Sequence, residues 1–435
     1  MIDGVGASVE DRPYWWRAAP PETVERDALH PDYDVVIVGA GLTGLRAAIE
    51  LARSGAKVLV CEREHAGFGA CRRNAGYLGR TLKKSFLDLT RARGTEYARR
   101  VYQELNAAFE TTLAFIEQER IECYANRCGR FIAATSRMHL EQLIANFHAL
   151  QEALGLPYQA LGAEQVAEEM GTALYCGGVV IPDLGSLHPG LYHRGLLRIA
   201  LAAGAAVATQ TDVRLIARNG ARFRLETSIG VFNAAHVVIA TNGYTPRHLR
   251  WYARRVIPFT GYMAATEELP PELLTELIPH RRTIVDSNVN VDFFRPAPDS
   301  SCLLLGGSAG MSLGDSRSIA EHMAKLLNRV YPQLKNVRIS AAWSGQCAGT
   351  FDLMPHVGCN DGIWYGLGYN FSGVPMGTYF GMRIGRAIIG GSSDRSVFSE
   401  TAFRSMPFYT GSPWFVPLAM RVFDWQDRRL ARQSA

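Results

Sequence analysis

The chain has 435 residues, of which 47% are hydrophobic and 20% charged, and its formal net charge is +5. This composition is typical of a globular protein, and the length favours two connected domains over one simple core. The mild charge, without a dense Lys/Arg run, argues against a nucleic-acid partner. The eight cysteines have no zinc-site spacing, so we expect no metal site and predict reduced thiols in a cytoplasmic protein. Residues 1–30 lack the pattern of a signal peptide, and no run is apolar enough for a transmembrane segment.

The first informative motif follows an apolar run that begins at Asp34. This run ends at the turn Gly39-x-Gly41-x-x-Gly44, and an amphipathic run, a second apolar run and Glu62 follow in order. This order predicts a dinucleotide-binding βαβ unit, in which a strand, a tight turn, a helix and a second strand are followed by an acidic residue. Gly39 allows the sharp turn, Gly41 lets backbone approach a pyrophosphate, and Gly44 lets the helix pack closely on the strand. Glu62 would accept hydrogen bonds from ribose hydroxyls.

The rest of the chain alternates helical and extended patterns. Helices are predicted over 95–120, 137–154, 189–203, 316–330 and 374–390. Strands are predicted over 205–216, 231–240, 256–266, 282–286, 291–295, 302–306, 337–343 and 362–367. The short apolar runs between 256 and 306 favour an antiparallel sheet.

This order predicts an α/β protein (α+β overall) with two interleaved domains. Residues 32–90, 186–255 and 337–395 would form a Rossmann-like nucleotide-binding domain. Residues 91–185 and 256–336 would form a substrate domain, built on an antiparallel sheet with helices. Residues 1–31 and 396–435 are expected to be terminal extensions packed on the body.

Three further segments suit FAD better than a nicotinamide. The loop Gly67 to Gly76 is glycine-rich and follows the ribose acid, and the strand before Thr241-Asn242-Gly243 ends in small and polar residues. A glycine turn also precedes the last long helix. The positive N-terminal end of that helix would face the flavin pyrimidine edge, where reduced flavin is anionic.

These motifs resemble those of the D-amino-acid-oxidase-like superfamily of FAD-dependent oxidoreductases, and within it the γ-glutamylputrescine oxidase-like amine oxidases. The resemblance is carried by Tyr14-Trp15, the fingerprint, Gly67-Phe68-Gly69-Ala70, Ala240-Thr241-Asn242-Gly243-Tyr244, Ala342-Trp343-Ser344-Gly345 and Thr350-x-Asp352-x-x-Pro355.

The resemblance implies oxidation of the CH–NH bond of a small amine or amino acid by hydride transfer to flavin N5. The imine would hydrolyse, and electrons would pass to O2 or another acceptor. Two alternatives are a flavin monooxygenase and a non-catalytic flavin- or ligand-binding protein. The oligomeric state is not predicted.

The resemblance also places a set of residues at the FAD. They are Gly39, Gly41, Leu42, Thr43, Gly44, Glu62, Arg63, Gly69, Ala70, Cys71, Arg73, Asn74, Ala75, Gly76, Val213, Thr241, Asn242, Gly243, Asn370, Phe371, Ser372, Gly373 and Val374.

The sequence departs from its relatives at three places. Many relatives carry Gly-His-Gly before the last helix, where this chain has Asn370-Phe371-Ser372-Gly373. The lysine that promotes oxygen reactivity in sarcosine oxidases would fall near Leu304, and 301–307 contains no lysine, so fast oxygen use is in doubt. Those enzymes tether flavin through a cysteine near Gly345, which predicts non-covalent FAD here, with Cys71 as the alternative link.

Three residues are candidates for the substrate pocket. Arg295 would bind a substrate carboxylate, or would simply be a surface arginine before a proline. Tyr262 and Tyr369 would form an aromatic wall for an amine. Asp352 is expected to form a turn rather than act as a base, and His356 is a weaker candidate for a direct role.

The C-terminal segment 407–432 is rich in aromatic residues and arginine. It suits either an amphipathic helix packed on the body, which we favour, or a helix lying in a membrane interface.

Overall fold

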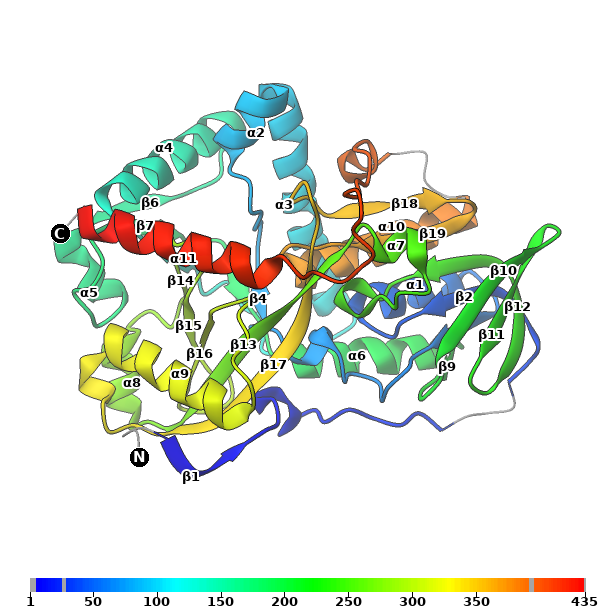
Figure 1. The fold of residues 1–435 in the computed structure, drawn as a ribbon, viewed down its shortest axis with the longest axis horizontal. Helices are drawn as coiled ribbons and strands as arrows, with labels where there is room; N and C mark the ends of the chain where they lie inside the picture. The colour runs from blue at the N-terminus through cyan, green and yellow to red at the C-terminus, as the bar shows by residue number, and fades with distance from the viewer. Residues whose placement is uncertain (1–4, 26–28, 391–394, 434–435) are drawn as a thin grey trace.

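The computed structural model describes residues 5–25, 29–390 and 395–433. Two large β-sheets organise them, and chain segments cross repeatedly from one to the other (Figure 1). The predicted mixed α/β fold, with a Rossmann-like domain, is confirmed.

The nucleotide-binding sheet has a parallel core in the order β19-β12-β2-β3-β9. An antiparallel extension, β10-β11-β12, continues it on one side, and β18 pairs with β19. The strands are β2 (Asp32–Val38), β3 (Val58–Cys61), β9 (Ala206–Ala208), β10 (Val213–Asn219), β11 (Arg222–Thr227), β12 (Gly230–Ile239), β18 (His356–Asn360) and β19 (Ile363–Leu367). Parallel strands buried on both faces explain the apolar runs in the sequence.

Three helices cover one face of this sheet: α1 (Leu42–Arg53), α6 (Pro189–Ala202) and α10 (Gly373–Ile389). α3 (Thr95–Gln118) packs on α10 and joins the same core. The single strand predicted over 205–216 is wrong. The chain turns at Gln210, which has φ +53°, so β9 pairs with β3 while β10 starts a hairpin.

The second sheet, here called the substrate sheet, has the order β1-β17-β13-β16-β15-β14-β5-β7-β6. It is mainly antiparallel, and the pairs β1–β17 and β14–β5 are parallel. Its strands are β1 (Val5–Glu10), β5 (Arg130–Ala133), β6 (Gln159–Gly162), β7 (Gly177–Ile181), β13 (Ile257–Glu268), β14 (Thr283–Asp286), β15 (Phe293–Pro296), β16 (Cys302–Gly307) and β17 (Ile339–Gly349). Both β1 and β17 lie outside the ranges predicted for the substrate domain.

The two faces of the substrate sheet have different neighbours. One face packs on α8 (Pro271–Leu277) and α9 (Ser316–Val330) through Leu303, Leu305 and Ala342. The other face, through Met263 and Trp343, packs on the segment around Tyr14 and Trp15. This second face is the one turned towards the nucleotide-binding part.

The remaining elements are shorter or lie at the periphery. They are α2 (Phe86–Arg93), α4 (Arg137–Leu154), α5 (Val166–Glu169), α7 (Arg250–Ala253), α11 (Val416–Gln433), the pair β4 (Tyr77–Leu78) and β8 (Gly185–Ser186), and the 3-10 turns η1 (Tyr14–Trp16), η2 (Ala70–Arg72), η3 (Ala163–Gln165), η4 (Asn242–Tyr244), η5 (Pro332–Leu334) and η6 (Val397–Ser399). Within the described part of the chain, none of the helices has the length and apolarity needed to cross a bilayer.

Candidate functional site

The glycine fingerprint forms the turn between β2 and α1. A Cβ on Gly39, which has φ +107°, would lie 2.9 Å from the Ala240 carbonyl oxygen, and one on Gly44 would lie 1.9 Å from the Gly39 oxygen. A Cβ on Gly41 would meet nothing within 4 Å. Packing therefore requires the first and third glycines, whereas the second leaves open space beside the N-terminus of α1, where a phosphate group would bind.

Glu62 lies at the end of β3, beside this turn. Its carboxylate accepts hydrogen bonds from the backbone N–H groups of Ala40, at 2.9 Å, and Glu64, at 3.1 Å. Burial raises the pKa of Glu62, and the two N–H donors act in the opposite direction. The oxygens keep lone pairs for further donors, which suits the predicted ribose contact.

The carbonyl of Ala40 is held from the other side. His193 Nε2 lies 2.7 Å from this oxygen, and Arg72 Nε donates to His193 Nδ1 over 3.0 Å. Burial, with the adjacent Arg72 charge, lowers the pKa of His193 to about 3. The imidazole is therefore neutral, and because Nδ1 accepts, Nε2 carries the hydrogen that is donated to Ala40.

The glycine-rich loop 67–76 is held by its own polar side chains. Arg73 donates to the Phe68 oxygen at 2.7 Å and to the Ser344 oxygen at 2.9 Å, which joins the loop to β17. Asn74 Nδ2 donates to the Ala70 oxygen at 2.9 Å, and Asn74 Oδ1 accepts from Gly76 N at 2.8 Å. Both side chains therefore fix the loop.

The start of α10 meets the segment after β12. Asn242 Oδ1 accepts from Gly368 N at 2.9 Å, and Asn370 Nδ2 donates to the Gly368 oxygen at 2.6 Å. Ser372 is 2% exposed, and its Oγ has no hydrogen-bond partner within the described residues. An unpaired buried hydroxyl at a helix N-terminus indicates a missing acceptor or donor at this position.

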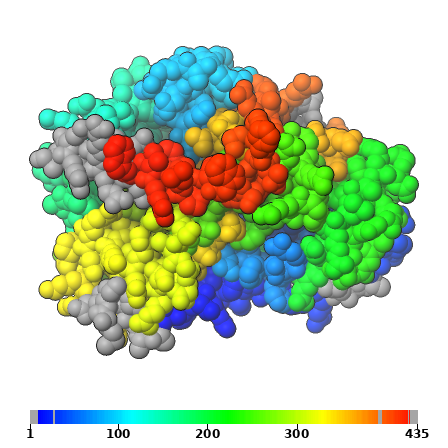
Figure 2. Space-filling view, in the orientation of Figure 1, coloured from blue at the N-terminus to red at the C-terminus, as the bar shows by residue number. Residues whose placement is uncertain are grey.

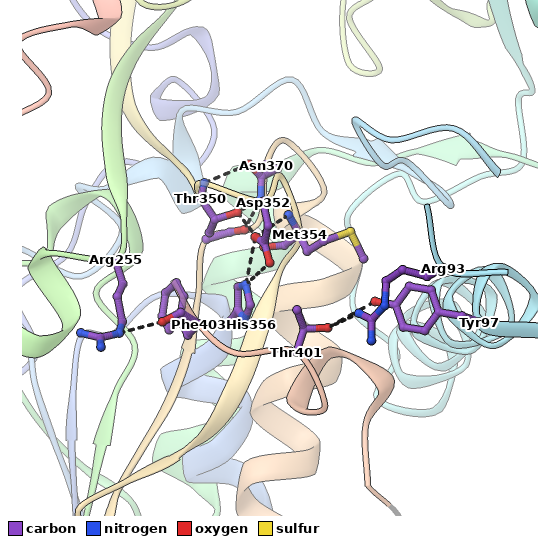
Figure 3. Close-up of polar contacts among 11 residues, drawn as sticks. Arg93, Tyr97, Arg255, Thr350, Asp352, Met354, His356, Asn370, Thr401 and Phe403 are labelled. Atoms are coloured by element: carbon purple, nitrogen blue, oxygen red, sulfur yellow. Dashed lines mark hydrogen bonds and ion pairs between the residues drawn. The ribbon is translucent and has the colours of Figure 1, made fainter. Parts of the chain in front are cut away.

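Buried His356 and half-buried Asp352 form a pair below this turn (Figure 3). His356 Nε2 lies 3.1 Å from both Asp352 oxygens, and its ring stacks on Phe403 with centroids 4.3 Å apart. Burial acts to raise the pKa of Asp352, but the contacts from His356 and from Met354 N outweigh it and lower that pKa overall. Asp352 thus shapes the turn before β18, and His356 holds it.

The face of the substrate sheet that is turned towards the nucleotide-binding part carries glycines and an aromatic ring. Gly261 of β13 pairs with Gly345 of β17, and both lie on the face that carries Met263. Phe259 contacts Phe371 of the α10 turn, with ring centroids 5.2 Å apart. The two domains therefore meet at an aromatic junction, defined here as Phe259, Phe371 and Lys83.

Lys83 at this junction was not found from the sequence. Its Nζ lies 4.8 Å from the centroid of the Phe371 ring and donates to the Val289 oxygen at 3.1 Å. It therefore bridges the α10 turn and the loop after β14. No sequence motif marked it, because the loop at 79–85 has no periodic pattern.

The prediction that Tyr262 lines the substrate side is wrong. Tyr262 lies on the opposite face of β13, in the core that packs on α9. Its hydroxyl donates to the Met311 oxygen at 2.7 Å and accepts from Leu313 N at 3.3 Å. It holds the loop that follows β16.

Tyr369 also has a different place from the predicted one. It is 6% exposed, and its hydroxyl lies 2.5 Å from Thr43 Oγ1 and donates to the Gly366 oxygen at 2.8 Å. Tyr369 and Thr43 therefore join the turn before α10 to α1, with both hydroxyls turned into the protein.

Arg295 does not offer its guanidinium to a ligand. It is 3% exposed and donates to the carbonyl oxygens of Ala75 and Leu187, both at 2.9 Å, and of Pro296 at 3.2 Å. Its guanidinium lies over the Trp15 ring, 5.6 Å from the centroid. The prediction that Arg295 binds a substrate carboxylate is therefore corrected. Backbone carbonyls occupy the guanidinium N–H groups, so the role of Arg295 is structural.

The remaining predicted cofactor residues lie around the same turns. Arg63 is exposed beside Glu64, and Val213 is buried at the start of β10. Thr241 Oγ1 lies 2.7 Å from Thr245 Oγ1, and a Cβ on Gly243 would lie 2.5 Å from the Cys347 oxygen. Further members lie at the start of η2, which Gly69 precedes, and in the first turns of α1 and α10: Gly69, Ala70, Cys71, Leu42, Gly373 and Val374.

Comparison with known proteins agrees with this geometry. The profile of the FAD dependent oxidoreductase family matches residues 34–387. The chain is 29% identical to the probable oxidoreductase OrdL of Haemophilus influenzae over 376 residues, covering 84% of this chain and 85% of the relative. It is 27% identical to the gamma-glutamylputrescine oxidoreductase of Escherichia coli over 388 residues, covering 86% and 87%.

Solved structures share the fold. The glycine oxidase of Geobacillus kaustophilus superimposes with a TM-score of 0.70 at 22% identity, covering 86% of this chain and 99% of that one. The L-amino acid deaminase of Proteus myxofaciens gives 0.71 at 15% identity, covering 93% and 98%. Because the family profile spans most of the sequence, this chain belongs to the FAD-dependent oxidoreductase family.

Proposed function

We propose that this enzyme oxidises the CH–NH bond of a small amine or amino acid at the aromatic junction. The observation that carries the proposal is the meeting of two FAD-side segments with the glycine-bearing face of the substrate sheet. Arg73 joins the loop 67–76 to Ser344, and Phe371 of the α10 turn contacts Phe259. A substrate held here lies between the two domains, where small-molecule sites commonly form.

The residues of the nucleotide-binding part fit FAD. The open space at Gly41 suits a pyrophosphate, the carboxylate of Glu62 suits a ribose, and the unpaired Ser372 hydroxyl suits a polar ring edge. When bound, FAD accepts the electron pair that leaves the substrate, whose imine product then hydrolyses.

The protein's part in this reaction is to desolvate and orient the amine. Aromatic side chains exclude water, and desolvation disfavours the ammonium form, so a neutral amine is favoured at Phe259 and Phe371. No carboxyl or imidazole group is assigned as a base, because Asp352 and His356 satisfy each other. The names of the E. coli and G. kaustophilus relatives support an amine or amino acid as substrate class.

Three finer assignments belong to this proposal. FAD is non-covalent, because burial raises the pKa of both Cys71 and Cys347 to about 12 and keeps these thiols protonated. The enzyme acts in the cytoplasm, in line with eight free cysteines. The acceptor is O2 or another oxidant, and buried Leu304 offers no cation to assist oxygen.

Anaerobic mixing tests the activity. The FAD-loaded protein is combined with a panel of amines and amino acids, and the flavin absorbance near its visible maximum is followed. Bleaching by an amine, followed by recovery in air, supports amine oxidation with O2 as acceptor. Bleaching only by NADPH, or by no compound of the panel, contradicts the proposal.

A further inference from the structure

The most exposed large apolar side chains of the described residues gather in the C-terminal segment. Phe408 is 96% exposed, Trp414 74%, Leu418 64% and Trp425 59%. Large apolar residues that gather on one part of a protein surface mark an interaction site. The other exposed apolar side chains are scattered over separate elements.

One side of α11 packs on the body. A Cβ on Gly310 would lie 2.8 Å from Met420 Cγ and 2.9 Å from Val416 Cγ1, so this side rests on the loop after β16. Phe415, just before the helix, contacts Phe351, with ring centroids 6.5 Å apart. The sequence prediction of a packed helix therefore describes the inner side of α11.

The outer side of α11 is apolar as well. Leu418, Val422 and Trp425 recur at intervals of four and three residues, which places them along one side of the helix, and exposed Trp414 lies in the turn just before it. The helix lies on the outside of the molecule, across the front in Figure 2. Because α11 lies on the outside of the molecule, its exposed apolar side is a convex surface. Such a surface suits a flat partner.

Charge favours an anionic partner. The sequence of α11 contains Arg421, Arg428, Arg429 and Arg432 against Asp424 and Asp427, and the whole chain carries +5. Arg421 is exposed next to Val422. Tryptophan, aliphatic residues and arginine on one surface helix are the composition of helices that lie in a lipid interface.

We propose that α11 docks this enzyme on the surface of an anionic phospholipid bilayer, with Trp414, Leu418, Val422 and Trp425 entering the headgroup region. The contact of Phe415 with Phe351 places the start of the helix beside the 350–354 turn, and Thr350 hydrogen-bonds to Asn370 of the candidate site (Figure 3). Docking would therefore bring the site close to the lipid surface.

Vesicle sedimentation tests this proposal with the FAD-loaded, full-length protein. We expect it to bind vesicles of phosphatidylcholine with phosphatidylglycerol, and to bind pure phosphatidylcholine vesicles on the order of tenfold more weakly. The combined variant Trp414→Ser, Leu418→Ser and Trp425→Ser should lose binding. Its matched control is Leu174→Ser with Leu215→Ser, two leucines that are 48% and 46% exposed elsewhere, and this control should bind like the original.

Each other outcome overturns the docking. If the original protein sediments with neither vesicle, or if the triple variant binds as well as the control, α11 is not a lipid-binding helix. Light scattering on the same samples identifies the rival occupant: a dimer that the triple variant converts to a monomer would assign the exposed apolar side of α11 to a second copy of the chain. Flavin absorbance verifies that every variant is folded and loaded.

Discussion

The Nε–H of Arg72 donates to Nδ1 of His193, and the other ring nitrogen of His193 holds the carbonyl of Ala40 within the fingerprint turn. Arg72 is fully buried, and it also donates to the Ala19 oxygen at 3.0 Å and to Glu22 Oε1 at 2.7 Å. The N-terminal segment is thereby connected to the turn by a chain of hydrogen bonds. The Ala40 carbonyl, an acceptor that would repel a phosphate, is kept turned towards His193.

His193→Leu should weaken FAD binding and folding together. The leucine leaves the Arg72 Nε–H and the Ala40 oxygen without partners, which costs about 2–4 kcal/mol. FAD affinity should fall on the order of tenfold, because the turn loses its fixed carbonyl. Flavin fluorescence titration and urea unfolding measure the two effects. His193→Gln is the matched control, since a glutamine can donate and accept in the same way; equal losses in both variants would contradict the hydrogen-bond role.

The same histidine should make the protein sensitive to mild acid. The pKa of His193 is about 3 in the folded protein, against about 6.5 in an unfolded chain. Between these values the unfolded state binds one more proton, so the free energy of unfolding falls as the pH falls through this window. His193→Gln removes this contribution. Urea unfolding of both proteins at a series of pH values should show the smaller pH dependence in the variant. If the free energy of unfolding changed equally with pH in both proteins, His193 would not be the source of the acid sensitivity.

Two glycines of the fingerprint should respond differently to alanine. Gly44→Ala places a Cβ 1.9 Å from the Gly39 oxygen, so it should destabilise the protein by more than about 2 kcal/mol. Gly41→Ala meets open space and has an ordinary φ of −81°, so the free energy of unfolding without FAD should change by less than about 1 kcal/mol. Its FAD affinity should nevertheless fall at least about tenfold. If the FAD affinity of Gly41→Ala were unchanged, the pyrophosphate would not bind beside Gly41.

The nucleotide-binding half was predictable because its residues are constrained locally. Gly39 needs a positive φ and Gly44 needs close contact with the strand. Both requirements select glycine, so the sequence shows glycines at a fixed spacing. The helix predicted over 316–330 matches α9, because its apolar positions repeat at helical spacing and Asp315 caps it. Such signals depend on few residues and do not require knowledge of distant contacts.

The substrate half was harder because its side chains take their roles from distant segments. Tyr262 was assigned to the wrong face of β13, since an alternation shifted by one residue exchanges the two faces of a strand. Arg295 has an unremarkable sequence context, and its acceptors at Ala75 and Leu187 come from loops more than 100 residues away. β1 was not predicted as a strand because it forms only by pairing with β17.

Arg295→Met should act on stability rather than on substrate choice. Removing the guanidinium leaves the Ala75 and Leu187 carbonyls without that donor in a buried region, at a cost of about 2–3 kcal/mol. We expect KM to change by the same factor for a carboxylate-bearing amine and for its neutral analogue. Steady-state kinetics with such a pair, beside urea unfolding, measures both. A selective increase in KM for the carboxylate compound would restore the role first predicted from the sequence.

Ser372→Ala should separate cofactor binding from folding. In the described residues the Ser372 hydroxyl is buried without a partner, so its removal should leave the free energy of unfolding without FAD unchanged or raise it by about 0.5 kcal/mol. If this hydroxyl contacts FAD, the variant should bind FAD about three- to tenfold more weakly, as loss of one hydrogen bond predicts. Thr378→Val is the matched control on the same helix: its hydroxyl bonds to Val374 and Tyr192, so it should lose about 1 kcal/mol of stability with little change in FAD affinity. Equal FAD affinity of Ser372→Ala and the original protein would place the cofactor away from the start of α10, and the unpaired hydroxyl would then need another ligand.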